Sequence, residues 1–169
     1  CSICALVAGA YKEMAKGKQI LIVDDDQEIR ELLKEYLTRS GFDVLAAAEG
    51  GEMYQHLAAN TPDLIILDIS IPKLDGLEVL ARFNAMNSTL KTLVLTAQSP
   101  TLFAMRCMQS GAAGYVCKQE ELSELVSAIK AVFSGYNYFP SQALTPEKNE
   151  TDNFSEIELF KQVNDRELM

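Results

Sequence analysis

The sequence predicts an α/β fold in which five parallel strands form one sheet with helices on both of its faces, a (βα)5 doubly wound architecture. Two observations predict it. Short apolar runs alternate with amphipathic stretches along most of the 169 residues, and the apolar runs are continuous rather than alternating in polarity. A continuous apolar run is typical of a strand buried on both faces, as strands are in a parallel sheet. Strands that alternate with helical stretches favour right-handed crossovers and the strand order 2-1-3-4-5.

The individual elements follow from these patterns. The runs expected as strands cover residues 19–23, 43–47, 64–67, 93–95 and 114–116. The stretches between and after them carry apolar residues at helical spacing, which predicts helices over 28–40, 51–59, 75–86, 100–109 and 120–133. Gly41 and Gly111 directly follow two of these stretches and are typical helix stops. The expected order is the flavodoxin-like one, in which ligands bind at the carboxyl ends of the strands.

Composition excludes several classes of function. Apolar residues make up 48 % of the chain and the net charge is −9, so we expect a folded, acidic domain. An acidic chain gains nothing from counterion release on nucleic acid, so we expect any DNA contact to come from outside these residues. Cys1 and Cys4 have a CxxC spacing, but no second pair completes a zinc site. Cys107 and Cys117 lie in apolar stretches and are expected as reduced core residues, which indicates a cytoplasmic protein. The apolar segment 3–10 is too short to cross a membrane.

Polar side chains end four of the five expected strands. Asp24 and Asp25 follow the first strand, Asp68 the third, Thr96 the fourth, and Lys118 lies near the end of the fifth. Because the first and third strands are neighbours in the expected order, the three aspartates should share one pocket. Clustered carboxylates repel each other, and oxygen ligands without sulfur or imidazole suit Mg²⁺.

This constellation predicts phosphoryl chemistry. A carboxylate such as Asp68 can act as the nucleophile toward phosphorus, and a cation neutralises charge on the transferring group. Thr96 offers a hydroxyl donor to the new phosphate, and Lys118 offers a positive charge. Two further acids, Asp26 and Asp75, precede helices and are expected as N-caps.

Five segments, in register along the chain, resemble the motifs of bacterial two-component response regulators, in their receiver (CheY-like) domain. They cover residues 20–26, 63–68, 71–76, 94–97 and 111–118. The resemblance implies that Asp68 is the phosphorylation site and that Asp24 and Asp25 hold the metal together with Asp68. It further implies that the main-chain carbonyl of Ser70 completes the metal site. Thr96 and Tyr115 would form the switch pair: the hydroxyl moves toward the phosphate and the aromatic ring turns inward. Lys118 would contact the phosphoryl group.

The resemblance also implies the wider setting: a sensor histidine kinase as phosphodonor, dimerisation on phosphorylation, and control of transcription through a DNA-binding domain. Activity would be limited to self-catalysed phosphotransfer and autodephosphorylation. One departure is Gln119, because many receivers have a proline in a cis bond after this lysine. A cis bond before glutamine would cost about 3 kcal/mol, so we expect a trans or a strained bond.

The expected domain organisation places a receiver over residues 18–135. Residues 1–17 would be an extension from an upstream start or added sequence, and residues 136–165 a linker with the aromatic cluster 136–139 at its beginning. Residues 118–122, and residues 165–168 at the end of the chain, resemble the NarL/FixJ subgroup, whose outputs are LuxR-type helix-turn-helix domains. Residues 166–169 would then open a truncated output domain.

Two other functions remain open at this point. One is a receiver-like interaction module that works without phosphorylation. The other is an aspartate-nucleophile phosphatase, suggested by the spacing of Asp24 and Asp26, although Gln27 and Glu28 follow where such enzymes have threonine or glycine. Multiple turnover of a phosphate ester would distinguish a phosphatase from stoichiometric labelling of Asp68.

Overall fold

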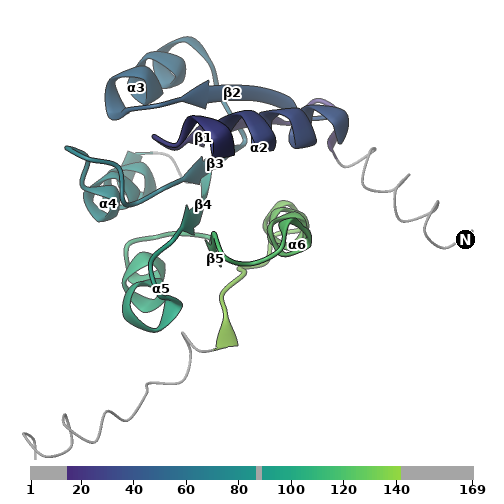
Figure 1. Cartoon of the computed structure of the whole chain (residues 1–169). Coiled ribbons are helices and arrows are strands. Elements are labelled where there is room, and N and C mark those ends of the chain that lie inside the picture. Colours follow the sequence, from purple (N-terminus) through teal and green to yellow (C-terminus); the bar gives the residue numbers. More distant parts are fainter. Residues whose placement is uncertain (1–14, 87–88, 142–169) are drawn as a thin grey trace, which may run out of the picture.

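The computed structural model describes residues 15–86 and 89–141. They form a five-stranded sheet in the order β2-β1-β3-β4-β5, and every neighbouring pair of strands is parallel. Figure 1 shows the sheet with helices on both of its faces. The predicted fold class and strand order are therefore confirmed. The strands are β1 (Gln19–Val23), β2 (Asp43–Ala47), β3 (Leu64–Leu67), β4 (Lys91–Thr96) and β5 (Gly114–Cys117).

The five predicted helices are all present, with small differences at their ends. They are α2 (Gln27–Arg39), α3 (Gly50–Ala59), α4 (Gly76–Met86), α5 (Pro100–Gln109) and α6 (Leu122–Phe133). The side chain of Asp26 caps α2 by accepting from Glu28 N and Ile29 N, as expected. Asp75 likewise accepts from Leu77 N and Glu78 N at the start of α4.

Two boundaries differ from the predictions by two residues, each for a physical reason, and the other differences amount to one residue. β4 begins at Lys91 rather than at residue 93, because Lys91 and Thr92 pair with β3 although the lysine is exposed. The last helix begins at Leu122 rather than at residue 120, because Glu120 N donates to Cys117 O in a turn that precedes it.

The sheet separates two apolar cores. On one face the core joins β1, β3 and β4 to α2 and α6, with Leu37 and Ile129 fully buried. On the other face it joins the same strands to α3, α4 and α5, with Met53 and Cys107 fully buried. Each strand thus packs on both sides, which explains why the strands are continuous apolar runs in the sequence. The two cores fix the carboxyl ends of the strands relative to each other.

The chain after α6 returns to the sheet. Tyr138 forms a parallel bridge with Gly114 of β5. Its N–H donates to Ala113 O at 2.9 Å, and its carbonyl accepts from Tyr115 N at 2.8 Å. The beginning of the segment expected as a linker is therefore paired with the edge strand.

Three further expectations concern a peptide bond, membrane-spanning segments and the two ends of the chain. The described part contains no cis peptide bond, so the Lys118–Gln119 bond is trans. None of its helices has the length and apolar character needed to cross a membrane. The described residues do not include most of the expected N-terminal extension, with Cys1 and Cys4. They also do not include the expected linker beyond residue 141 or residues 166–169.

Candidate functional site

Three aspartates meet at the carboxyl edge of the sheet. Asp24 follows β1 and Asp68 follows β3, and the last residues of these strands, Val23 and Leu67, are partners in the parallel register. Asp24, Asp25 and Asp68 each place a carboxylate oxygen within 4.8 Å of the other two. Asp24 and Asp68 are buried, whereas Asp25 is exposed. The pocket predicted from the strand ends is therefore present.

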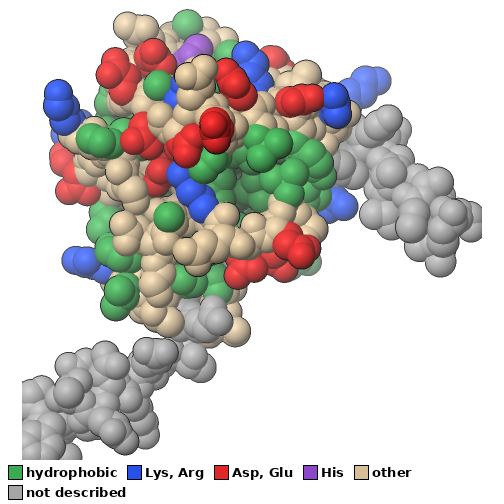
Figure 2. Space-filling model, viewed as in Figure 1, with side chains coloured by type: hydrophobic (Ala, Val, Ile, Leu, Met, Phe, Trp, Pro, Cys, Tyr) green, Lys and Arg blue, Asp and Glu red, His purple; other side chains and the backbone are tan. Residues whose placement is uncertain are grey.

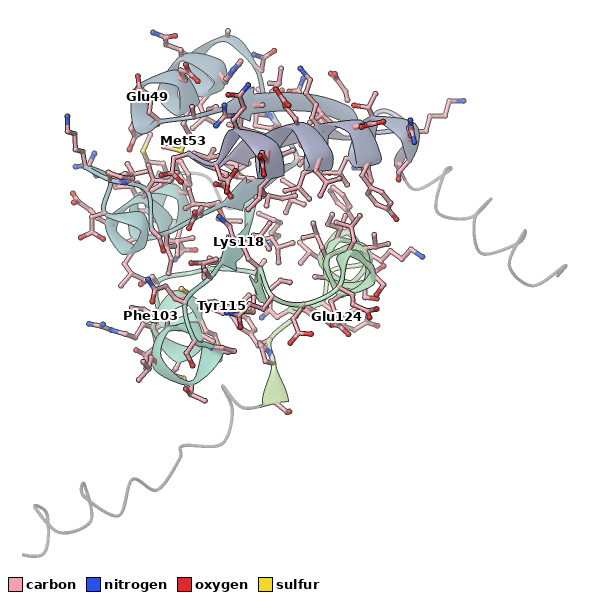
Figure 3. The ribbon with its side chains drawn as sticks, viewed as in Figure 1. Glu49, Met53, Phe103, Tyr115, Lys118 and Glu124 are labelled. Atoms are coloured by element: carbon pink, nitrogen blue, oxygen red, sulfur yellow. The ribbon has the colours of Figure 1, made fainter. Side chains whose placement is uncertain are left out.

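Lys118 reaches into this acidic pocket from the end of β5. Its Nζ lies 2.7 Å from Asp24 Oδ2 and 2.8 Å from Asp68 Oδ2. Its own N–H donates to Thr96 O at 2.8 Å, which ties the lysine to the end of β4. Figure 3 shows Lys118 near the centre of the molecule, at the edge where the strands end. The ammonium group thus partly neutralises two buried carboxylates.

Main-chain amides fix the other oxygen of each buried carboxylate. Asp26 N donates to Asp24 Oδ1, and Ser70 N donates to Asp68 Oδ1, both at 2.9 Å. These bonds orient the carboxylates so that both Oδ2 atoms face Lys118. The loop is also held from α2, because Arg30 Nη1 donates to the carbonyl of Asp24 at 2.8 Å.

The electrostatics of the pocket favour a bound cation. Burial raises the pKa of Asp24 and outweighs the opposing effect of the lysine. Burial lowers the pKa of Lys118, but its close contacts with the carboxylates of Asp24 and Asp68 outweigh this and leave the pKa raised. Within the described residues, Asp24 Oδ2 is buried without a well-aligned hydrogen bond, and Lys118 is its ion-pair partner. An oxygen of this kind, beside two more carboxylates, fits a hard divalent cation such as Mg²⁺.

A chain of polar contacts connects the acceptor edge with Tyr115. Thr96 Oγ1 lies 3.1 Å from Ser70 Oγ. Gln98 N donates to Thr96 Oγ1 at 3.3 Å, and Gln98 Nε2 donates to Ser70 Oγ at 3.4 Å. Tyr115 OH donates to the Gln98 carbonyl at 2.8 Å, and the tyrosine is fully buried. The aromatic ring therefore points inward, and the Thr96 hydroxyl pairs with Ser70 rather than with Asp68.

An apolar hollow adjoins the pocket. It lies between α2 and α6 and has a volume of about 230 Å³. The residues that line it include Leu32, Leu33, Leu122 and Leu125, together with Lys118. Figure 2 shows this apolar area beside a basic side chain and several acidic ones.

The sequence did not reveal every residue that shapes the site. The contact of Arg30 with the Asp24 carbonyl and the pairing of the Ser70 and Thr96 hydroxyls were not expected. No periodic pattern marks Arg30, because its partner is a main-chain atom. The sequence indicated Ser70 only by its position two residues after Asp68. That position does not predict the direction of its hydroxyl group.

Comparison with known proteins now decides the family. Residues 20–130 match the sequence profile described as the response regulator receiver domain. The chain belongs to this family. The chain is 43 % identical over 151 residues to the virulence factors putative positive transcription regulator BvgA of Bordetella pertussis, a match that covers 89 % of the chain and 72 % of BvgA.

Solved structures agree in fold. The receiver resembles a LuxR family two-component response regulator from Aurantimonas sp. SI85-9A1 with a TM-score of 0.69 and 30 % identity, over 79 % of this chain and 96 % of that one. It also resembles the response regulator TrrA of Thermotoga maritima, solved in complex with Mg²⁺ and BeF, with a TM-score of 0.60 and 36 % identity. That match covers 67 % of this chain and 96 % of TrrA. The expected response regulator family is thereby confirmed, and the NarL/FixJ subgroup is compatible with the match to a LuxR family member.

Proposed function

We propose that this receiver accepts a phosphoryl group on Asp68 and that Asp24, Asp25, Asp68 and the Ser70 carbonyl hold Mg²⁺ beside it. The observation that carries the proposal is the meeting of three carboxylates at one edge of the sheet, within 4.8 Å of one another. The match to TrrA, which was solved with Mg²⁺ and BeF, supports the same ligand chemistry here.

The residues divide the chemistry between them. A carboxylate oxygen of Asp68 attacks phosphorus, the bond from phosphorus to the donor breaks, and the donor leaves. Bound Mg²⁺ would neutralise charge on the transferring group. Lys118, already 2.8 Å from Asp68 Oδ2, pairs with the new phosphate, and the Thr96 hydroxyl leaves Ser70 to donate to it. Tyr115 is the second member of the switch.

The wider role follows from the relatives. We propose a sensor histidine kinase in the cytoplasm as the phosphodonor and the control of transcription through a DNA-binding output domain, because BvgA is described as a transcription regulator. Phosphorylation would shift a pre-existing equilibrium between two conformations, since the phosphate interacts better with Thr96 and Lys118 in one of them. Homodimerisation would accompany that shift. In this proposal the chain performs no reaction beyond its own phosphorylation and dephosphorylation.

Domain boundaries are part of the proposal. The receiver would span residues 18–135, followed by a linker over residues 136–165 and the beginning of an output domain at residues 166–169. The pairing of Tyr138 with β5 means that the first linker residues lie against the receiver.

Intact-mass measurement after incubation with acetyl phosphate and Mg²⁺ tests the phosphoacceptor. Wild type should gain one phosphate and Asp68→Asn none. Asp26→Asn is a matched control, because asparagine also caps a helix and the variant should still be labelled. Equal labelling of wild type and Asp68→Asn would remove Asp68 from the acceptor role. Absence of labelling in all three would favour the phosphorylation-independent module, and repeated turnover of a phosphate ester would favour the phosphatase.

A further inference from the structure

The segment that follows α6 is attached to the strand that carries the switch tyrosine. Tyr138 pairs with β5 through two main-chain hydrogen bonds, from its own N–H to Ala113 O and from Tyr115 N–H to its carbonyl. Figure 1 shows this yellow-green segment beside β5, between α5 and α6. The outer edge of β5 is therefore covered at this point by the chain's own continuation, although the pairing is limited to one bridge.

Gly114 makes this close approach possible. A Cβ atom at this position would lie 2.6 Å from Leu93 Cδ1 and 2.9 Å from the Tyr138 carbonyl oxygen. Any other residue at position 114 would push the segment away from β5 or disturb the core. The strand is thus built to accept a paired segment at its edge.

Side chains hold the segment on both sides of the sheet. The Tyr138 ring packs against the core formed with α2 and α6, and its hydroxyl donates to Glu124 of α6. Phe139 packs against the opposite core, which includes Tyr115. Figure 3 labels Tyr115 and Glu124 close to this segment. A hollow of about 310 Å³ adjoins the segment and leaves room for it, or for the Tyr138 ring, to move. Its lining includes Tyr115, Glu124, Tyr138 and Phe139.

Tyr115 is consequently held from two directions. Its hydroxyl donates to the Gln98 carbonyl, and its N–H donates to the Tyr138 carbonyl, both at 2.8 Å. Gln98 N in turn donates to Thr96 Oγ1. A continuous set of contacts therefore runs from the switch threonine through Gln98 and Tyr115 to the chain after α6.

We propose that Tyr138 is a positioning residue for Tyr115 and that phosphorylation of Asp68 loosens the pairing of Tyr138 with β5. This inference rests on the proposed function, because it assigns that function's output to the linker. When the Thr96 hydroxyl turns from Ser70 to the phosphate, Gln98 moves with it. The Gln98 carbonyl then shifts the Tyr115 hydroxyl, which is hydrogen-bonded to it. The two hydrogen bonds to Tyr138 form a single bridge, whereas four residue pairs join β5 to β4 in a ladder, so the bridge is the attachment that a small movement can break.

Hydrogen exchange in the full chain tests the first half of the proposal. The probe is beryllofluoride with Mg²⁺, which mimics a phosphoryl group on a carboxylate. The Tyr138 amide should exchange at least about fivefold faster with the probe, the factor expected when about one hydrogen bond is lost. Asp68→Asn should show no change. Exchange at Tyr138 that is equal with and without bound beryllofluoride would overturn the proposal.

Reciprocity of coupling provides the second test. If phosphorylation loosens the attachment of the segment, then a substitution that weakens this attachment must favour the phosphorylated conformation. Tyr138→Phe removes the hydroxyl contact with Glu124, so it should bind beryllofluoride more tightly than wild type. Tyr136→Phe alters an exposed neighbour and should bind as wild type does. A purely structural role for Tyr138 would lower the stability of the variant and leave its affinity unchanged, which would contradict the proposal. Failure of wild type to bind beryllofluoride would instead overturn the proposed function.

Discussion

Among single residues, Lys118 contacts both buried aspartates of the acidic pocket. Its ammonium group pairs with Asp24 and Asp68, whose side chains are 2 % and 4 % exposed. The aspartates and the lysine could be predicted from sequence, because polar residues at the ends of neighbouring parallel strands converge. The hydroxyl pairing of Ser70 with Thr96 could not, because a rotatable hydroxyl finds its partner only once the fold is known.

Lys118→Met tests how the two buried carboxylates are balanced. Methionine has an apolar side chain that is similar in length to that of lysine, but it leaves both carboxylates without their cation. Removal of one partner from a buried ion pair costs about 3 kcal/mol, so the free energy of unfolding should fall by about that much without Mg²⁺. Saturating Mg²⁺ should recover part of the loss. Urea denaturation measures both values, with the exposed Lys34→Met as control. A loss that is the same with and without Mg²⁺ would contradict the proposed metal site.

At the level of elements, the apolar runs and caps determined most of the structure. β1 and β3 could be predicted to the residue, because their runs are bounded by polar side chains. The start of β4 at Lys91 could not, because an exposed lysine in a strand looks like a loop residue. The bridge at Tyr138 could not be predicted either, since two hydrogen bonds leave no periodic pattern.

Gly76 controls how α4 follows the acceptor loop. A Cβ atom there would lie 2.7 Å from Cα, Cβ and Cγ2 of Ile69, next to Asp68. Gly76→Ala should therefore displace this backbone and lower the free energy of unfolding by about 2 kcal/mol. Gly51→Ala in α3 is the control, because the nearest atom to the new Cβ would be Oε1 of the flexible Glu49 side chain, at 3.6 Å. Alanine is also the better helix former, so that variant should be more stable by about 0.5 kcal/mol. Thermal unfolding compares the two, and an unaffected Gly76→Ala would disprove the close packing.

Cys107 of α5 makes stability depend on alkaline pH. The thiol is fully buried, and burial raises its pKa from 9.0 to about 11. The unfolded chain therefore loses this proton before the folded protein does, so stability present below pH 9 should decline as the pH rises to about 11. Cys107→Ala should decline less steeply over the same range in denaturant titrations. A wild-type thiol that reacts rapidly with iodoacetamide at pH 8 in the native state would show that it is not buried as described.

In the molecule as a whole, two cores hold five strand ends in fixed positions, and the chemistry takes place at those ends. The receiver fold and the position of the acidic pocket were predictable because they follow from hydrophobic pattern and strand order. The direction in which the switch side chains point was not, because it depends on hydrogen bonds such as that from Tyr115 to Gln98. The proposed function therefore requires that a carboxylate oxygen of Asp68 is the nucleophile that attacks phosphorus.

Chemical location of the phosphoryl group tests that claim most directly. The full chain would be labelled with acetyl phosphate and Mg²⁺, reduced with borohydride to convert an aspartyl phosphate to homoserine, and mapped by peptide mass spectrometry. We predict homoserine at position 68 and unmodified aspartate at positions 24 and 25. Homoserine at position 24 or 25, with Asp68 unmodified, would contradict the account.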